Sequence, residues 1–217
     1  MKKTWIFTAL AVVLTLAVLF GVSRVVLYTD ETGFHVVDRN AAEIYVNKDA
    51  WKFENIELET VDSNIEFVIT NRFGFEFMAD STMDTVYTNQ DGKLSIRQSS
   101  KDLLLNFNLW PTKKDYVKLY IPDRVDLKQV KINAKNGEIT IARLKCENLD
   151  ITSDTGNITV TLAGQAEDYN SDITADGGSI TVDGKAVEAY QVKNADATKS
   201  VTINANGGDV TVYFKGQ

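Results

Sequence analysis

The sequence contains very few of the residues on which cysteine and histidine chemistry depends. Among 217 residues there is one cysteine, Cys146, and one histidine, His35. A single cysteine cannot form an internal disulfide, and a single histidine removes most histidine-based metal binding and acid–base catalysis. No Gly-x-Ser-x-Gly sequence is present to position a serine nucleophile. We therefore expect no catalytic residue and no cofactor, and we expect Cys146 to be a buried structural residue.

Basic residues are too few for a protein that binds nucleic acid. The chain has 23 lysine and arginine residues against 30 aspartate and glutamate residues, which gives a net charge of -7. Such a chain repels phosphate backbones, so nucleic acid is not an expected partner. The excess of acid instead favours cationic ligands, such as basic peptides or the basic domain of another protein.

Charged residues are absent from one long segment near the N-terminus. Residues 4–23 carry no charge, and a helix of this length spans about 30 Å, the thickness of a hydrocarbon core. Lys2 and Lys3 precede the run, so the positive-inside rule places the N-terminus in the cytoplasm. We predict a single-pass membrane anchor in residues 1–28, with the C-terminal part of the chain extracytoplasmic.

A cleaved signal peptide is the alternative interpretation of this segment. Gly21 and Ser23 are small residues with the spacing of a cleavage site. The uncharged run is longer than the apolar region of most signal peptides, which favours the anchor. Both interpretations predict an exported domain in residues 29–217.

Helical periodicity is missing from the exported part, and period-two alternation replaces it. The segment 130–135, VKINAK, is one example, with apolar residues at every second position. This pattern is typical of a strand with one buried face. We therefore predict an all-β domain.

The alternation forms a repeat around four glycines. Relative to each glycine, apolar or small residues occupy positions −7, −5, −3, +2 and +4. The apolar residues thus occupy odd offsets before the glycine and even offsets after it, a change of alternation that requires a corner or bulge at the glycine. We predict that these glycines are structural turns, because glycine adopts positive φ at low cost. They are Gly137, Gly156, Gly178 and Gly208.

The spacing of these glycines is close to the length of one solenoid rung. We predict a β-solenoid-like domain, of the parallel β-helix or β-roll type, with regular repeats from about residue 125. An antiparallel β-sandwich is the alternative. Weaker copies of the repeat surround Ser63 and follow Gly92. The aromatic-rich residues 29–116 are expected to cap the solenoid, and the apolar run 103–110 either closes the core or forms a binding patch.

These features resemble one bacterial family. The segments 56–67 and 117–122, followed by the units NGEITI, TGNITV, GGSITV and GGDVTV, are similar to the "putative adhesin" β-strand-repeat family over roughly residues 50 to 214. The resemblance implies an N-terminal membrane segment and a β-solenoid-like surface domain of undefined activity, sometimes associated with envelope stress. It implies no shared catalytic residues.

Acidic residues near the turns raise two further possibilities. Repeated calcium-binding rolls need a Gly-Gly-x-Gly-x-Asp unit, which this chain lacks, so we expect no metal site. Polysaccharide cleavage needs one specific pair of carboxylates, and the sequence singles out none. The residues concerned are Asp154, Asp172, Asp176, Asp183 and Asp209.

The sequence therefore predicts a membrane-anchored, non-catalytic interaction module, adhesin-like or linked to envelope stress. Its expected partner is an envelope protein, a peptide or a glycan, and self-association stays open. The alternatives are a carbohydrate-active enzyme on a β-solenoid, by fold analogy, and a passive surface scaffold.

Overall fold

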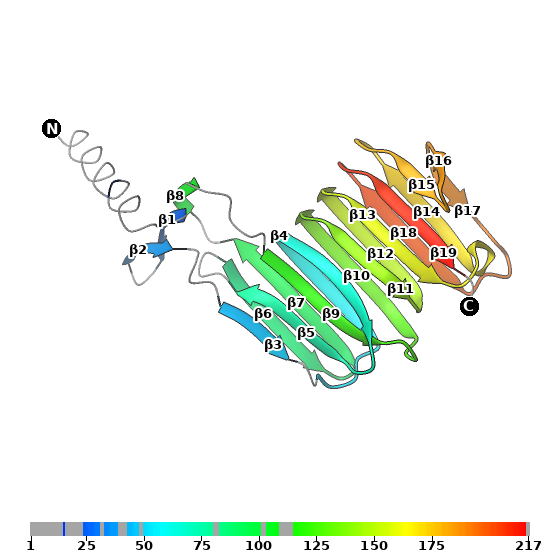
Figure 1. Cartoon of the computed structure of the whole chain (residues 1–217), viewed down its shortest axis with the longest axis horizontal. Helices are drawn as coiled ribbons and strands as arrows, with labels where there is room; N and C mark the ends of the chain where they lie inside the picture. The colour runs from blue at the N-terminus through cyan, green and yellow to red at the C-terminus, as the bar shows by residue number, and fades with distance from the viewer. Residues whose placement is uncertain are drawn as a thin grey trace. The chain divides into compact units, whose positions relative to one another are not determined.

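The computed structural model describes residues 15, 24–30, 33–38, 43–47, 50–79, 83–100, 103–108 and 115–215. The predicted membrane span, residues 4–23, lies outside this part of the chain except for Thr15. In the described part, no helix is long and apolar enough to cross a bilayer. The chain forms two compact units, which are considered one at a time (Figure 1).

The smaller unit is a three-stranded antiparallel sheet. Strand β1 (Arg24–Asp30) lies in the centre, between β2 (Gly33–Asp38) and β8 (Leu103–Asn108). The β1–β2 hairpin places Asp38 opposite Val25 and His35 opposite Tyr28. Strand β8 contains most of the apolar run 103–110, whose side chains lie outside the described part of the structure. The predicted cap, residues 29–116, thus contributes strands to both units.

The larger unit consists of strands arranged as two faces around one core. Its strands are β3 (Glu43–Asn47), β4 (Asn55–Thr70), β5 (Gly74–Ala79), β6 (Met83–Gln90), β7 (Lys93–Ser100), β9 (Asp115–Pro122), β10 (Leu127–Asn136), β11 (Ile139–Leu144), β12 (Cys146–Thr155), β13 (Ile158–Ala163), β14 (Tyr169–Ala175), β15 (Ile180–Val182), β16 (Lys185–Val187), β17 (Tyr190–Val192), β18 (Lys199–Ala205) and β19 (Val210–Lys215). A short 3-10 helix, η2 (Ala166–Asp168), precedes β14.

The first face has the strand order β6-β7-β4-β10-β12-β18-β14-β17, and the second has the order β3-β5-β9-β4-β11-β13-β19-β15-β16. Each repeat supplies one strand to each face, and the long strand β4 supplies both. Neighbouring repeats pair in parallel: Val130 pairs with Ile56 and Leu149. This parallel register confirms the β-solenoid-like prediction, and it shows that the antiparallel sandwich is wrong for this unit.

The alternating apolar residues point between the two faces, as their period predicts. Strands β10 and β12 have the same burial pattern along their ten residues, and Ile132 and Ile151 are completely buried. Each such side chain contributes about 1.5–3 kcal/mol through removal of its surface from water. The core is therefore a stack of aliphatic columns that runs from one rung to the next.

The order of the rungs differs from the order of the repeats in the sequence. The repeat around Gly208, in β18 and β19, lies between the repeats around Gly156 and Gly178. Copies that follow one another in the sequence are therefore not neighbours in the stack at this point. Strands β16 and β17 occupy the outer edges of β15 and β14 in antiparallel orientation. The last repeat, β18 and β19, pairs with the inner edges of β14 and β15.

The segment after Gly92 also differs from its predicted register. Leu94 and Ile96 fit the positions after a corner glycine, but they pair with Ile56 and Leu58, which precede the corner. Gly92 instead belongs to the hairpin turn between β6 and β7, where its φ is 74°.

At the corner between the two faces, successive backbones approach so closely that no side chain fits. A Cβ atom on Gly156 would lie 2.0 Å from the carbonyl oxygen of Gly137, and one on Gly137 would lie 2.1 Å from that of Ser63. The same contact continues from Gly208 to Gly156 and from Gly178 to Gly208. We call this stack of Ser63 and four glycines the glycine column.

Polar side chains next to the glycine column satisfy backbone groups of the following rung. Asn64 Oδ1 accepts a hydrogen bond from the Glu138 amide at 2.9 Å, and Asn157 Oδ1 accepts one from the Asp209 amide at 3.0 Å. Asp209 in turn accepts bonds from the Ser179 amide and hydroxyl, which lower the pKa of Asp209. The corner is therefore hydrogen-bonded along the stack.

Replacing Gly156 with alanine should destabilise the protein far more than the same change at Gly184. Both glycines have positive φ, but a Cβ atom on Gly184 would meet nothing within 4 Å. We expect Gly184→Ala to cost about 1–2 kcal/mol through backbone strain alone. Gly156→Ala adds the clash and should cost roughly 3 kcal/mol or more. Urea unfolding followed by circular dichroism measures both, and equal midpoints would contradict the close approach.

Candidate binding surfaces

Cys146, the first residue of β12, is buried, and its thiol has low reactivity. Its side chain is 2% exposed, and desolvation raises the pKa of the thiol to about 12. The structure thus confirms the prediction that Cys146 is a buried residue. Among the residues that the structure describes, no three histidine, cysteine or acidic side chains are grouped so as to hold a metal ion.

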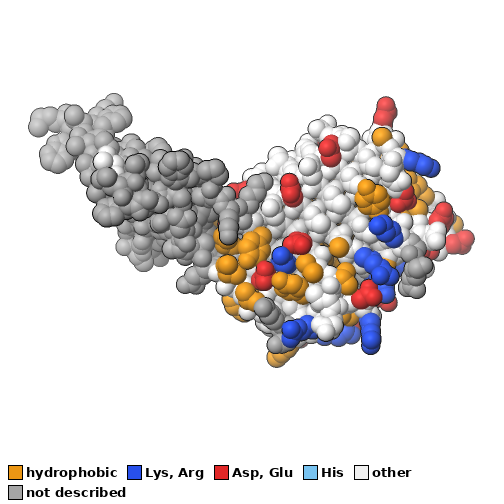
Figure 2. All heavy atoms as spheres, in the orientation of Figure 1, with side chains coloured by type: hydrophobic (Ala, Val, Ile, Leu, Met, Phe, Trp, Pro, Cys, Tyr) orange, Lys and Arg blue, Asp and Glu red, His pale blue; other side chains and the backbone are white. Residues whose placement is uncertain are grey.

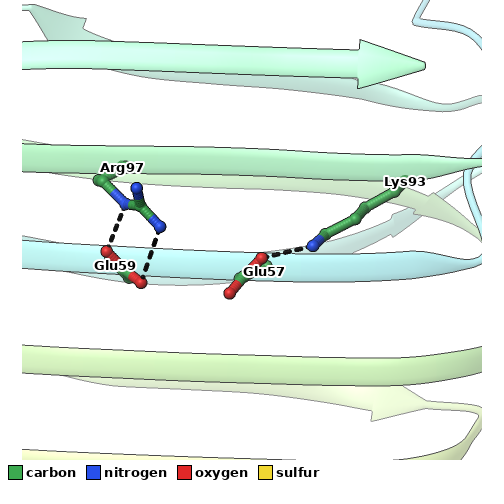
Figure 3. A network of polar contacts seen from close by, with 4 residues as sticks. All are labelled: Glu57, Glu59, Lys93 and Arg97. Carbon is green, nitrogen blue, oxygen red and sulfur yellow. Dashed lines mark hydrogen bonds and ion pairs between the residues drawn. The ribbon is translucent and has the colours of Figure 1, made fainter.

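In the half of the larger unit that contains β4, β7 and β9, four outward-facing glutamates have cationic partners. Figure 3 shows the first face, where Glu57 of β4 pairs with Lys93 of β7 at 2.5 Å, and Glu59 pairs with Arg97 through two nitrogens. On the second face, Glu66 pairs with Lys118 at 3.0 Å. We call the half of the larger unit that contains β4, β7 and β9 the paired half.

Glu54 is the most strongly stabilised carboxylate of the paired half. Lys52 and Lys128 each lie 2.7 Å from its oxygens. The hydrogen bond from Lys128, followed by that from Lys52, lowers the pKa of Glu54 to about 2. Because these groups are solvent-exposed, the contacts favour the charged form of Glu54 more than they stabilise the fold.

Carboxylates on the other half of the first face form no ion pairs in the described part of the chain, although Lys131 of β10 lies in register beside Asp150. Asp150 of β12 pairs in register with Thr202 of β18, and Thr202 pairs with Asp172 of β14. Asp154 and Asp176 occupy a later outward position on the same two rungs. We call these four residues the acidic face. Within the described ranges, no lysine or arginine forms an ion pair with any of them.

Carboxylates of the acidic face lie on strands that are two positions apart in the sheet. Adjacent strands lie about 4.8 Å apart, so Asp150 and Asp172, two strands apart, are separated by about 10 Å. Asp154 and Asp172 accept hydrogen bonds from the neutral amides of Asn206 and Gln191, each at 3.0 Å. Amides orient these carboxylates without neutralising them, so the negative charge stays available to a partner.

Aromatic side chains close the core at the end formed by β3, β5 and β6. The rings of Tyr45 and Phe77 stack with centroids 5.1 Å apart, and Tyr45 and Tyr87 lie 4.7 Å apart. The two tyrosine hydroxyls share a hydrogen bond of 2.5 Å, which is the main cause of the raised pKa of Tyr87. Tyr45 comes from the second face and Tyr87 from the first, so the pair joins the two faces.

The same end also exposes apolar side chains to solvent. In the described part of the chain, every exposed large hydrophobic residue lies on β3, on β6 or at Trp51, whose side chain is 75% exposed. Figure 2 shows hydrophobic side chains gathered over this end. We call the set the apolar end; it comprises Ile44, Val46, Trp51, Val86 and Tyr87.

The sequence predicts these surfaces only in part. Asp154, Asp172 and Asp176 are among the acids expected near turns, and Trp51, Tyr45 and Tyr87 lie in the aromatic-rich segment expected to cap the solenoid, but Asp150, Ile44 and Val86 are not among the predicted residues. The alternation of Asp150 with the buried Ile151 could have placed it on the outer surface. The structure places His35 in β2 of the smaller unit.

A family model, Toastrack DUF4097, matches residues 53–217. The chain belongs to this family. The match confirms the resemblance inferred from the repeats, and the family is a domain of unknown function.

Solved structures of low sequence identity are also similar. One is a "putative cell adhesion protein" from Clostridium sporogenes, with 13% identity, coverage of 80% of this chain and 100% of that chain, and a TM-score of 0.49. Another is a "putative adhesin" from Bacteroides fragilis, with 9% identity, coverage of 80% and 97%, and a TM-score of 0.28. No curated protein matches. The family assignment rests on the family model alone.

Cys146 should resist alkylation while the protein is folded. Because burial raises the pKa of the thiol to about 12, little thiolate forms at pH 8 and the reagent cannot reach the sulfur. Iodoacetamide followed by mass spectrometry should give an unmodified chain in buffer and a singly modified chain in urea. Rapid modification in buffer would show that the rung opens locally.

Glu54 should make stability depend on pH in the acid range. Its folded pKa of about 2 lies below the ordinary value of 4.5. Its stabilising contribution is therefore present above pH 4.5 and is lost as the pH falls toward 2. The difference in unfolding free energy between wild type and Glu54→Gln should be small at pH 7 and shrink at pH 3. Lys128→Met should show the same dependence, and a pH-independent difference would contradict the ion pairs.

Proposed function

We propose that this chain is a non-catalytic, extracytoplasmic binding module, anchored by residues 1–28, whose acidic face binds a cationic partner. The observation that supports this most directly is the contrast between the two halves of the first face. Glu57 and Glu59 are neutralised by strand neighbours, whereas the four carboxylates of the acidic face form no ion pair in the described part of the chain, although Lys131 lies in register beside Asp150. Such a surface complements lysine and arginine side chains from elsewhere.

The geometry of the acidic face suits an extended basic segment or a basic protein surface. A strand-like peptide advances about 3.3 Å per residue, so cations three residues apart match the spacing of about 10 Å between Asp150 and Asp172. Threonine and asparagine hydroxyl and amide groups between the carboxylates, at Thr202 and Asn204, can hydrogen-bond to the same partner. The proposed partner is therefore a basic peptide or the basic ectodomain of an envelope protein.

The other functions fit this surface less well. Paired glycosidase carboxylates lie on either side of a bound sugar, whereas Asp150 and Asp172 lie on the same face of one sheet and would contact a ligand from one side. A passive scaffold would not need a cluster of carboxylates that form no ion pairs. Binding uses the charge directly, since it accelerates association and selects the sign of the partner.

Removing charge from the acidic face should weaken binding of a cationic peptide. We expect the double variant Asp150→Asn, Asp172→Asn to lose about 2- to 30-fold in affinity for a lysine-rich peptide, because each exposed ion pair contributes about 0.2–1 kcal/mol. Fluorescence anisotropy with the full chain in detergent, at low and high salt, measures this loss.

The matched control is the double variant Glu57→Gln, Glu59→Gln, which removes the same charge from the paired half. It should bind the peptide like wild type, and binding should weaken as salt rises. Equal losses in the two double variants, or binding that is insensitive to salt, would refute the acidic face as the site.

A further inference from the structure

The apolar end has the composition of a surface that meets a lipid interface. Trp51, Tyr87 and the aliphatic Ile44, Val46 and Val86 combine exposed apolar area with ring N–H and O–H groups. Tryptophan and tyrosine are enriched at membrane–water interfaces because one part of the ring is apolar and the other can hydrogen-bond. The opposite end of the unit differs, since its edge strands β16 and β17 have only three residues each and no exposed large hydrophobic side chain in the described part.

The chain itself keeps the apolar end close to the predicted membrane anchor. Strand β1 begins at Arg24, directly after the uncharged run, and the β1–β2 hairpin returns the chain so that Asp38 lies opposite Val25. Paired Cα atoms in such a ladder are about 5 Å apart. The six residues from Asp38 to Ile44 extend at most about 22 Å. Ile44 is therefore held within about 27 Å of Val25, wherever the two units lie.

Charge favours the same orientation. The cations Lys52, Lys93 and Arg97 lie in the paired half, next to the apolar end. Strand β12, which carries Asp150, is four strands from β6, or about 19 Å, and β14 is about 29 Å away. Both distances exceed the Debye length of about 8 Å at physiological salt. An anionic lipid surface at this end would thus lie much closer to the ion pairs of the paired half than to the acidic face.

We propose that the apolar end of the larger unit docks on the lipid surface of the membrane that anchors the chain. This inference rests on the anchor of the proposed function. Docking is edge-on: it brings Trp51 and the edge strands β3 and β6 to the interface, and it holds the acidic face, on more distant strands, at a distance from the membrane where soluble or envelope partners can reach it. It would give the larger unit one orientation relative to the membrane.

Trp51 provides a direct test. In the full chain with Trp5→Phe and Trp110→Phe, Trp51 is the only tryptophan, and the protein is reconstituted into phosphatidylcholine–phosphatidylglycerol vesicles with and without brominated acyl chains. We expect a blue-shifted emission that loses about half its intensity with brominated lipid, because interfacial groups lie about 5–10 Å into the headgroup and acyl boundary.

The matched control moves the tryptophan to the other end of the unit. In the same background with Trp51→Phe, Lys185→Trp on the exposed edge strand β16 should show neither the blue shift nor the quenching. Quenching of both positions alike would overturn the orientation. Absence of quenching at Trp51 would overturn the docking, and a blue shift without quenching that grows with protein density would assign this end to a second copy of the chain.

Two readouts separate this inference from the proposed function. Flotation of the vesicles reports the anchor, and peptide anisotropy on the same sample reports the acidic face. A chain that floats and binds the peptide, but whose Trp51 is not quenched, refutes only the docking. A chain that does not float refutes the anchor and the docking together, whereas loss of peptide binding alone refutes the acidic face.

Discussion

The close approach of backbones along the glycine column is the constraint on which the larger unit depends. Each glycine lies against the carbonyl oxygen of the previous rung, so a slip of one residue would place a side chain where only 2.0 Å is available next to Gly137. The corner therefore fixes the register of both faces together. Once the register is fixed, the aliphatic columns on either side of the corner align, and the outward side chains form ladders whose pairing is equally fixed.

Much of this arrangement could be predicted from the sequence, because it is local. The offsets of apolar residues from Gly137 and Gly156 state which side chains are buried and where the chain turns. The order of the rungs is not local. Ile203 and Ile173 fit equally well next to Ile151, so hydrophobic pattern does not decide which repeat is the neighbour. That choice follows from β16 and β17, which occupy the outer edges and leave an inner place for the last repeat.

The acidic face could not be predicted for the same reason. Glu57 and Asp150 both alternate with buried residues and look alike in the sequence. They differ because Lys93, 36 residues from Glu57, reaches it from a strand that only the fold places next to β4. Whether an outward-facing carboxylate has a cationic partner thus depends on which strands the fold places side by side. The sequence could give the overall excess of acid, but only the stack separates neutralised carboxylates from available ones.

The two ends of the stack also acquire different roles from the strand order. Exposed edges invite pairing with another chain, and short edge strands limit it. Because the last repeat inserts into the interior, the far end is left with β16 and β17, which are too short to extend the sheet further. The near end keeps the eight-residue strand β6 and the exposed apolar residues around it. Such an apolar surface is the part of the unit best suited to meet another apolar phase, and we propose the anchoring membrane for that role.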